Sequence, residues 1–95
     1  MRIITKKRLV EFAKRHPDAK EPLFSWYHIV DKQDFVHLAD LRTVFRSADS
    51  VGKFTVFNIG GNKYRLIVVI HYNRRIVYIR HVLTHSEYNA GKWKE

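Results

Sequence analysis

The chain lacks cysteine altogether and holds only two prolines and four glycines among its 95 residues. Without cysteine, no disulfide can stabilise the fold and no thiolate zinc site can form, which fits a reducing cytoplasm. No apolar run approaches the roughly 20 residues of a membrane span. The N-terminal MRIITKKRL has neither the continuous apolar stretch nor the small-residue cleavage site of a signal peptide. We therefore expect one cytoplasmic domain over residues 1–95, with no membrane partner.

Acidic residues are also scarce, with nine Asp and Glu against eighteen Lys and Arg, a net charge of +9 and a pI of about 10.1. Such an excess on a small domain indicates a polyanionic partner, either nucleic acid or an acidic protein. The plainer alternative is a basic protein with scattered lysines. No D-x-D or H-x-x-x-E cluster is present, and the expected strand–helix join separates His81 from His85, so we expect no metal and no cofactor.

Helical patterns occupy the first half of the sequence, after a possible short strand at Met1–Ile4. Thr5 suits the N-cap of a first helix, which His16-Pro17 should end because the residue before proline avoids helical geometry. Asp18 and Glu21 have capping-box spacing for a second, strongly amphipathic helix. We expect a further helical turn at Asp40–Phe45 and a loop at 47–52.

From Phe54 onward the apolar period changes to two, which predicts strands. We expect three of them, with two-residue turns at Gly60-Gly61 and Asn73-Arg74; they are Phe54–Ile59, Lys63–Tyr72 and Arg75–Leu83. The fold class is therefore α+β: two N-terminal helices packed on a three- to four-stranded antiparallel sheet, followed by a short C-terminal helix.

The turn lengths determine which side chains share a face of the sheet. Two-residue turns place Phe57 opposite Tyr64, Arg80 opposite Ile67, and Arg65 opposite Val82. A three-residue second turn would bury an unpaired guanidinium, which is very unfavourable. The face toward the helices should then be apolar, with Phe57, Leu66, Val68, Ile70, Val77, Ile79 and Leu83. The other face should carry Asn58, Lys63, Arg65, His71, Tyr78 and Arg80.

Thr84 and Glu87 have the S/T-x-x-E spacing of a capping box, so a short helix should begin at His85. This spacing favours a purely structural role for Thr84 and Glu87 over a functional one. His85 would stand at the first position of this helix, where the helix dipole favours a neutral imidazole, which suits a general base. A histidine at such a position is more often an ordinary surface residue, and that alternative stays open beside the catalytic one.

These residues match the chemistry of RNA cleavage without a metal ion. A base must remove the 2′-OH proton, cations must stabilise the charged phosphorane, and an acid must protonate the leaving 5′-oxygen. We predict His85 as base or acid, Arg65 and Arg80 as a phosphate clamp, and Tyr88 as a hydrogen-bond donor or acid. Arginine suits the clamp because its planar fork pairs two phosphate oxygens.

Two segments, "VFNIGGNKYRLIVVI" and "VYIRHVLTHSEY", resemble the HigB family of type II toxin–antitoxin toxins, within the RelE/ParE-like superfamily. The N-terminal "MRIITKKRLVEFAKRHPDAKEPLFSWY" also resembles that family. The resemblance implies an mRNA endonuclease, usually acting at the translating ribosome, and a HigA-like helix-turn-helix antitoxin. It also implies an exposed, concave basic sheet face. Motif positions in this sequence assign RNA binding to Asn58, Asn62, Lys63 and Tyr78.

Two other functions remain possible at the level of sequence. A basic toxin could block the ribosome or a nucleic-acid enzyme without cutting, as gyrase-inhibiting relatives of similar fold do. An RNA-binding module could stack bases on sheet aromatics, but only Tyr78 is well placed for that. His85 beside the arginines favours the nuclease.

Overall fold

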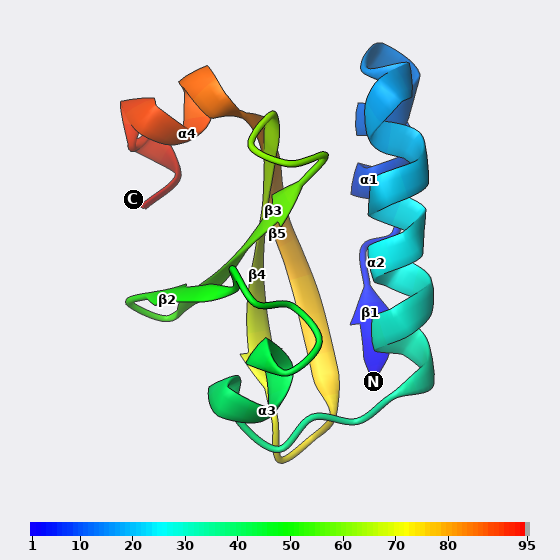
Figure 1. Ribbon diagram of the computed structural model, residues 1–95, viewed down its shortest axis with the longest axis vertical. Coiled ribbons are helices and arrows are strands. Elements are labelled where there is room, and N and C mark those ends of the chain that lie inside the picture. Colours follow the sequence, from blue (N-terminus) through cyan, green and yellow to red (C-terminus); the bar gives the residue numbers. More distant parts are fainter. Residues whose placement is uncertain (95) are drawn as a thin grey trace.

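The computed structural model describes residues 1–94 and confirms the α+β class, as Figure 1 shows. The sheet has the order β1-β5-β4-β3-β2, with β1 parallel to β5 and the other pairs antiparallel. This five-stranded mixed sheet corrects the expected three- to four-stranded antiparallel one. The elements are β1 (Arg2–Ile4), α1 (Lys7–Arg15), η1 (Pro17–Ala19), α2 (Lys20–Lys32), α3 (Leu38–Arg42), β2 (Asp49–Val51), β3 (Phe54–Ile59), β4 (Tyr64–His71), β5 (Ile76–Thr84), α4 (His85–Ala90) and η2 (Lys92–Lys94).

Three local expectations in the first half of the chain are wrong. Thr5 does not cap α1; the N-cap is Lys6, and Thr5 itself has a left-handed backbone with φ of 79°. Asp18 lies in the 3-10 turn η1 and makes no capping bond to α2, because its carboxylate binds side chains of the sheet instead. The expected loop at 47–52 contains the edge strand β2. Within residues 1–94, no helix is both long and apolar enough to cross a bilayer.

Helices α1 and α2 cover one face of the sheet and form the main core with it (Figure 1). Trp26 of α2 packs edge-on against Phe57 of β3, with ring centroids 5.3 Å apart. Six of the seven predicted helix-facing residues are confirmed here: Phe57, Leu66, Val68, Val77 and Ile79 are buried, and Ile70 packs against them. Burying side chains of this kind contributes about 1.5–3 kcal/mol each, so this layer is the main source of stability.

A β-bulge in β5 explains why the predicted register fails at the end of that strand. Ile70 pairs with Val77 and Val68 with Ile79, as the two-residue turn predicts, but Ile67 then pairs with His81. Arg80 is the extra residue, left without a partner in the ladder, and every later residue changes face. Leu83 was expected in the main core and lies on the opposite face instead.

The first hairpin has a longer turn than expected. Ile59 pairs with Tyr64, so residues 60–63 form a four-residue turn, and the pairs shift by two positions. Gly60 and Gly61 both adopt left-handed backbone, with φ of 61° and 69°. Because strand faces alternate with a period of two, a shift of two keeps each β3 and β4 side chain on its predicted face.

The face opposite α1 and α2 carries a second, smaller core, so it is not the open basic surface that we expected. Phe54, Val56, Ile67 and Trp93 are buried there. In Figure 1, α4 and the chain after it lie on this side of the sheet, away from α1 and α2. Trp93 packs edge-on against Phe54 at 5.7 Å, which fixes η2 to the sheet.

Candidate active site at the end of the sheet

The start of α4 is held by the predicted capping box. The Thr84 hydroxyl accepts from the Glu87 backbone N–H at 3.2 Å, and a Glu87 carboxylate oxygen accepts from the Thr84 N–H at 2.9 Å. This backbone bond, helped by the Thr84 hydroxyl and nearby Arg15 and His16, lowers the pKa of Glu87 despite partial desolvation. The His85 N–H also donates to the Lys63 carbonyl at 2.9 Å. The helix start is therefore fixed to the β3–β4 turn.

Arg65 is buried under the C-terminal segment, with only 8% of its surface exposed. Its guanidinium donates to the carbonyls of Asn62 at 3.1 Å and Tyr64 at 3.2 Å. The same guanidinium lies 5.2 Å from the ring centroid of Tyr88. Tyr88 in turn stacks on Trp93, with centroids 5.2 Å apart and planes 13° apart. The fold thus brings together two predicted site residues and fixes both.

The predicted RNA-binding residues of the β3–β4 hairpin lie in two different environments. Asn58 is opposite Arg65 in the ladder, and its amide donates to Asn62 at 3.4 Å, beside the Arg65 cluster. Lys63 instead reaches Asp18 at 3.0 Å. Asp18 also accepts from the Tyr64 hydroxyl at 2.6 Å, and both bonds lower the pKa of Asp18. Lys63 therefore forms part of a contact between η1 and the sheet.

Arg80 is exposed at the bulge, and its side chain makes no hydrogen bond or ion pair with any of residues 1–94. The next residue, His81, is half-buried. Burial lowers the pKa of His81 most, and the positive charges of Arg8 and Arg80 lower it further. At neutral pH, a mainly uncharged imidazole thus stands next to an unpaired guanidinium in the C-terminal half of β5.

His85 and Tyr78 stand at the two extremes of the predicted site. His85 is exposed at the first position of α4, one helical turn before Tyr88. Tyr78 is half-buried lower in β5, edge-on to His71 at 5.3 Å. Tyr78 pairs with Val69, which is four positions along β4 from Arg65, so the two levels are roughly 13 Å apart at about 3.3 Å per residue. The structure therefore places Tyr78 near Arg80 in β5 but away from Arg65, Tyr88 and His85.

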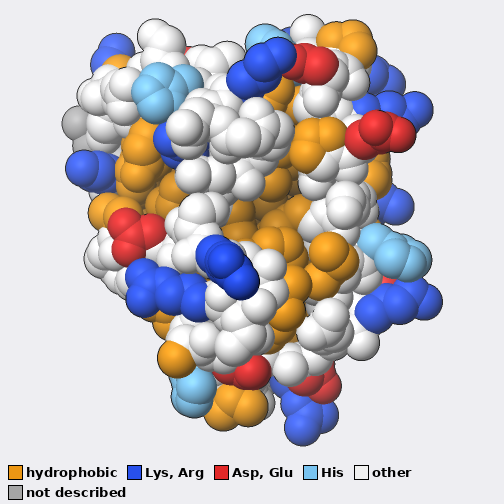
Figure 2. Space-filling model, viewed as in Figure 1, with side chains coloured by type: hydrophobic (Ala, Val, Ile, Leu, Met, Phe, Trp, Pro, Cys, Tyr) orange, Lys and Arg blue, Asp and Glu red, His pale blue; other side chains and the backbone are white. Residues whose placement is uncertain are grey.

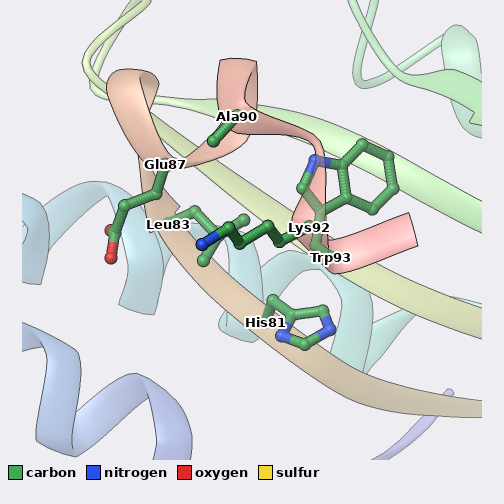
Figure 3. A pocket seen from close by; sticks show the side chains of 6 residues that line it. All are labelled: His81, Leu83, Glu87, Ala90, Lys92 and Trp93. Carbon is green, nitrogen blue, oxygen red and sulfur yellow. The ribbon is translucent and has the colours of Figure 1, made fainter. Parts of the chain in front are cut away.

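A pocket of about 450 Å³ opens between β5 and the C-terminal segment (Figure 3). It is lined by His81, Leu83, Glu87, Ala90, Lys92 and Trp93. A smaller hollow of about 140 Å³ shares His81 and Leu83 and reaches Arg8 and Arg15 of α1. Sequence reasoning missed His81 and Trp93 as site residues, because the bulge that turns His81 to this face has no signal in the residue pattern.

Positive side chains are scattered over the face that Figure 2 shows. Lys and Arg stand at its edge and also near its middle, and hydrophobic atoms show between them. Over residues 1–94, no three His, Asp or Glu side chains gather in a way that could hold a metal ion.

Comparison with known proteins gives consistent matches along the chain. A family model described as HigB_toxin, the RelE-like toxic component of a toxin–antitoxin system, matches residues 19–91. The mRNA interferase toxin HigB of Escherichia coli K12 is 35% identical over 92 residues, covering 94% of this chain and 88% of that protein. The mRNA interferase HigB of Shigella flexneri gives the same values. That of Escherichia coli O6:H1 strain CFT073 is 30% identical, over 94% and 89% of the two chains.

Proposed function

The chain belongs to the HigB family of RelE-like toxins of toxin–antitoxin systems, and from that premise we propose that it is an endoribonuclease that cleaves mRNA. The observation that carries the proposal is the exposed, unpaired Arg80 beside His81, on the strand that leads directly into His85. An unpaired guanidinium on a surface is free to bind a phosphate through two parallel hydrogen bonds. A histidine five residues later, His85, supplies an imidazole, the side chain most often used for proton transfer.

The proposed reaction is attack of the 2′-oxygen on the adjacent phosphorus. The base takes the 2′-OH proton, the P–O5′ bond breaks, and the acid gives a proton to the departing 5′-oxygen. The products are a 2′,3′-cyclic phosphate and a free 5′-hydroxyl. Arg80 stabilises the negative charge that develops on the phosphate oxygens, and His85 transfers one of the protons. The side chains supply all of the charge and proton transfer, without a metal.

Arg65 and Tyr88 have a different part in this proposal. Three contacts already engage the Arg65 guanidinium, namely two carbonyls and the Tyr88 ring. We assign Arg65 as a positioning residue that holds Tyr88 in place through this cation–π contact. Tyr88, half-buried one helical turn after His85, then presents its hydroxyl as a hydrogen-bond donor to the phosphate or as the acid. Asn58 and Asn62 border the same cluster and are assigned to the RNA backbone.

The test uses the purified chain and an end-labelled RNA, with a chelator of divalent ions in the assay of RNA alone and with Mg²⁺ in a parallel assay that contains ribosomes. Cleavage that leaves 2′,3′-cyclic phosphate ends supports the proposal, and cleavage only with ribosomes supports action during translation. Binding of RNA or ribosomes without any new RNA ends would contradict it and indicate a toxin that blocks without cutting. Mapping RNA 5′ ends shortly after induction repeats the test in cells.

We further propose a HigA-like helix-turn-helix protein as the antitoxin. With a net charge of +9, the chain favours a partner that brings an acidic surface or segment. Exposed charge pairs are screened over about 8–10 Å at ordinary ionic strength, so affinity should fall as salt rises. A complex equally tight at low and high salt would contradict a charge-driven interface.

A further inference from the structure

We infer that the pocket between β5 and the C-terminal segment binds one nucleobase of the RNA, with guanine preferred. The inference rests on the proposed function, because it names the part of the RNA that this pocket would hold. The pocket volume of about 450 Å³ lies within the range of about 300–1,000 Å³ that is typical of small-ligand sites. Single-stranded RNA is read mainly through unstacked bases that insert between planar side chains.

The walls of the pocket suit a flat aromatic ligand. Leu83 and the indole of Trp93 form apolar surface, and the imidazole of His81 supplies a planar ring on the strand (Figure 3). The Trp93 ring is fixed by its stack on Tyr88 and by a bond from its Nε1 to the Tyr88 carbonyl at 2.9 Å. A wall fixed in this way loses little side-chain entropy when a base binds.

The state of His81 favours stacking over charge attraction. Burial, together with the charges of Arg8 and Arg80, lowers the pKa of His81, so the ring is mainly neutral at pH 7. A neutral imidazole can stack on a base without the desolvation cost of a charged group. His81 also directly follows Arg80, so a base in the pocket would belong to a nucleotide whose phosphate can lie near that guanidinium.

The rim of the pocket carries one acceptor and one cation. Glu87 uses a single carboxylate oxygen, Oε1, in the capping box, and its lowered pKa keeps the group ionised at neutral pH. Guanine presents two adjacent donors, N1–H and N2–H₂, that can both converge on the remaining oxygen, Oε2, whereas uracil presents only one donor, N3–H. Figure 3 shows Lys92 extending across the pocket toward Leu83, where its ammonium can meet a phosphate of the same RNA.

The first experiment measures nucleotide binding by NMR on the purified full chain, independently of cleavage. Guanosine 5′-monophosphate should shift the resonances of the His81 ring, the Ala90 amide and the Trp93 indole N–H, and leave those of His28 on α2 unchanged. Uridine 5′-monophosphate should bind at least tenfold more weakly. Absence of pocket shifts at millimolar guanosine monophosphate, or equal binding of both nucleotides, would overturn the inference.

Three substitutions sharpen this test. His81→Ala should weaken guanosine monophosphate binding at least tenfold, whereas His81→Phe, which keeps a planar ring, should retain most of it. Glu87→Gln retains an acceptor for the capping box and should remove the preference for guanosine over uridine monophosphate. His28→Ala, a histidine exposed on α2, is the matched control and should change nothing. Wild-type behaviour of both His81→Ala and Glu87→Gln would refute the inference.

Cleavage mapping separates a failure of this inference from a failure of the proposed function. If the wild type cuts RNA and His81→Ala cuts with the same sequence preference and the same KM, the pocket does not read a base, but the nuclease assignment stands. If the wild type binds guanosine monophosphate in the pocket but never cuts RNA, the binding site stands and the nuclease assignment fails. We expect His81→Ala to change the sequence preference of cleavage. We also expect it to raise KM by a larger factor than it lowers kcat.

Discussion

Arg65 and Arg80 stand on neighbouring strands, and the sequence predicts the same role for both, that of a phosphate clamp. The fold gives them opposite surroundings. Arg65 is 8% exposed and bound to two carbonyls and an aromatic ring. Arg80 is exposed at a bulge, and its side chain makes no hydrogen bond or ion pair to the part of the chain that the structure describes. A guanidinium that is buried and held by two carbonyls and an aromatic ring is less accessible to a ligand than an exposed one whose side chain has no partner.

The same contrast extends to the residues of α4. Tyr88 is held between Arg65 and Trp93, whereas His85 is exposed at the helix start. We call Arg65 and Tyr88 the held pair and Arg80 and His85 the free pair. Changing the free pair should affect the reaction and spare the fold. Changing the held pair should affect the fold first and the reaction through it.

The largest expected effect is that of His85→Ala. Loss of a group that transfers a proton in the transition state costs roughly 10²–10⁴ in rate, and the exposed side chain contributes little packing. RNA cleavage should fall by that factor while the melting temperature stays within 2 °C or so of wild type, as expected of an exposed side chain. The control is His28→Ala. Cleavage at the wild-type rate by His85→Ala would place His85 among ordinary surface histidines.

Arg80→Ala should have the next largest effect. Removing one donor that stabilises developing charge costs about 10²–10³ in rate, with little change in stability at an exposed site. Arg74→Ala, in the exposed β4–β5 turn, removes an equal charge far from the bulge and is the control. If both substitutions reduce cleavage equally, Arg80 contributes only general positive charge and the free pair has no special role.

The contrast between Arg65 and Arg80 could not be predicted from the sequence, for a physical reason. Alternation along β4 and β5 correctly predicted the helix-facing residues from Leu66 to Ile79, because period-two patterns follow directly from strand geometry. The Thr84–Glu87 capping box was predicted because its two bonds are local. The bulge at Arg80 depends on how two strands and the C-terminal segment pack together, so no local pattern reveals it.

The environment of Arg65 was missed for a related reason. Trp93 lies nearly thirty residues further along the chain, and the stack of Trp93 on Tyr88 is what covers the Arg65 guanidinium. Strand β1 was expected, but its parallel pairing with β5 was not, because sequence alternation does not specify which edge a short strand joins. The functional class could be predicted because the motif residues are local; their division into held and free could not.

Arg65→Met should have a moderate effect that falls mainly on stability. Methionine keeps an unbranched apolar side chain but leaves the carbonyls of Asn62 and Tyr64 without their donor, at a cost of about 1–3 kcal/mol in the free energy of unfolding. Urea denaturation measures the loss, with Arg74→Met as the control. An unchanged midpoint together with lost cleavage would make Arg65 a phosphate ligand and remove the distinction between the two pairs.

The smallest expected effect concerns the pH dependence of the cap that positions the free His85. The pKa of Glu87 is lowered from its usual 4.5, chiefly by the Thr84 backbone N–H, so the folded state prefers the ionised carboxylate. Its contribution to stability is therefore complete above pH 4.5 and is lost as the pH falls below 4.5 through the folded-state pKa.

Glu87→Gln keeps an acceptor for Thr84 but carries no charge, so it isolates this contribution. At neutral pH it should be less stable than wild type by about 0.3–1 kcal/mol, the usual value of an acidic side chain near a helix N-terminus. The difference should shrink toward zero as the pH falls from 4.5 toward 3, as expected when the carboxylate is protonated. Asp18, whose pKa is also lowered, titrates equally in both proteins and cancels in the comparison. Urea unfolding of both proteins at several pH values gives the result. A difference that does not change with pH would mean that the hydrogen bond, and not the charge, holds the start of α4.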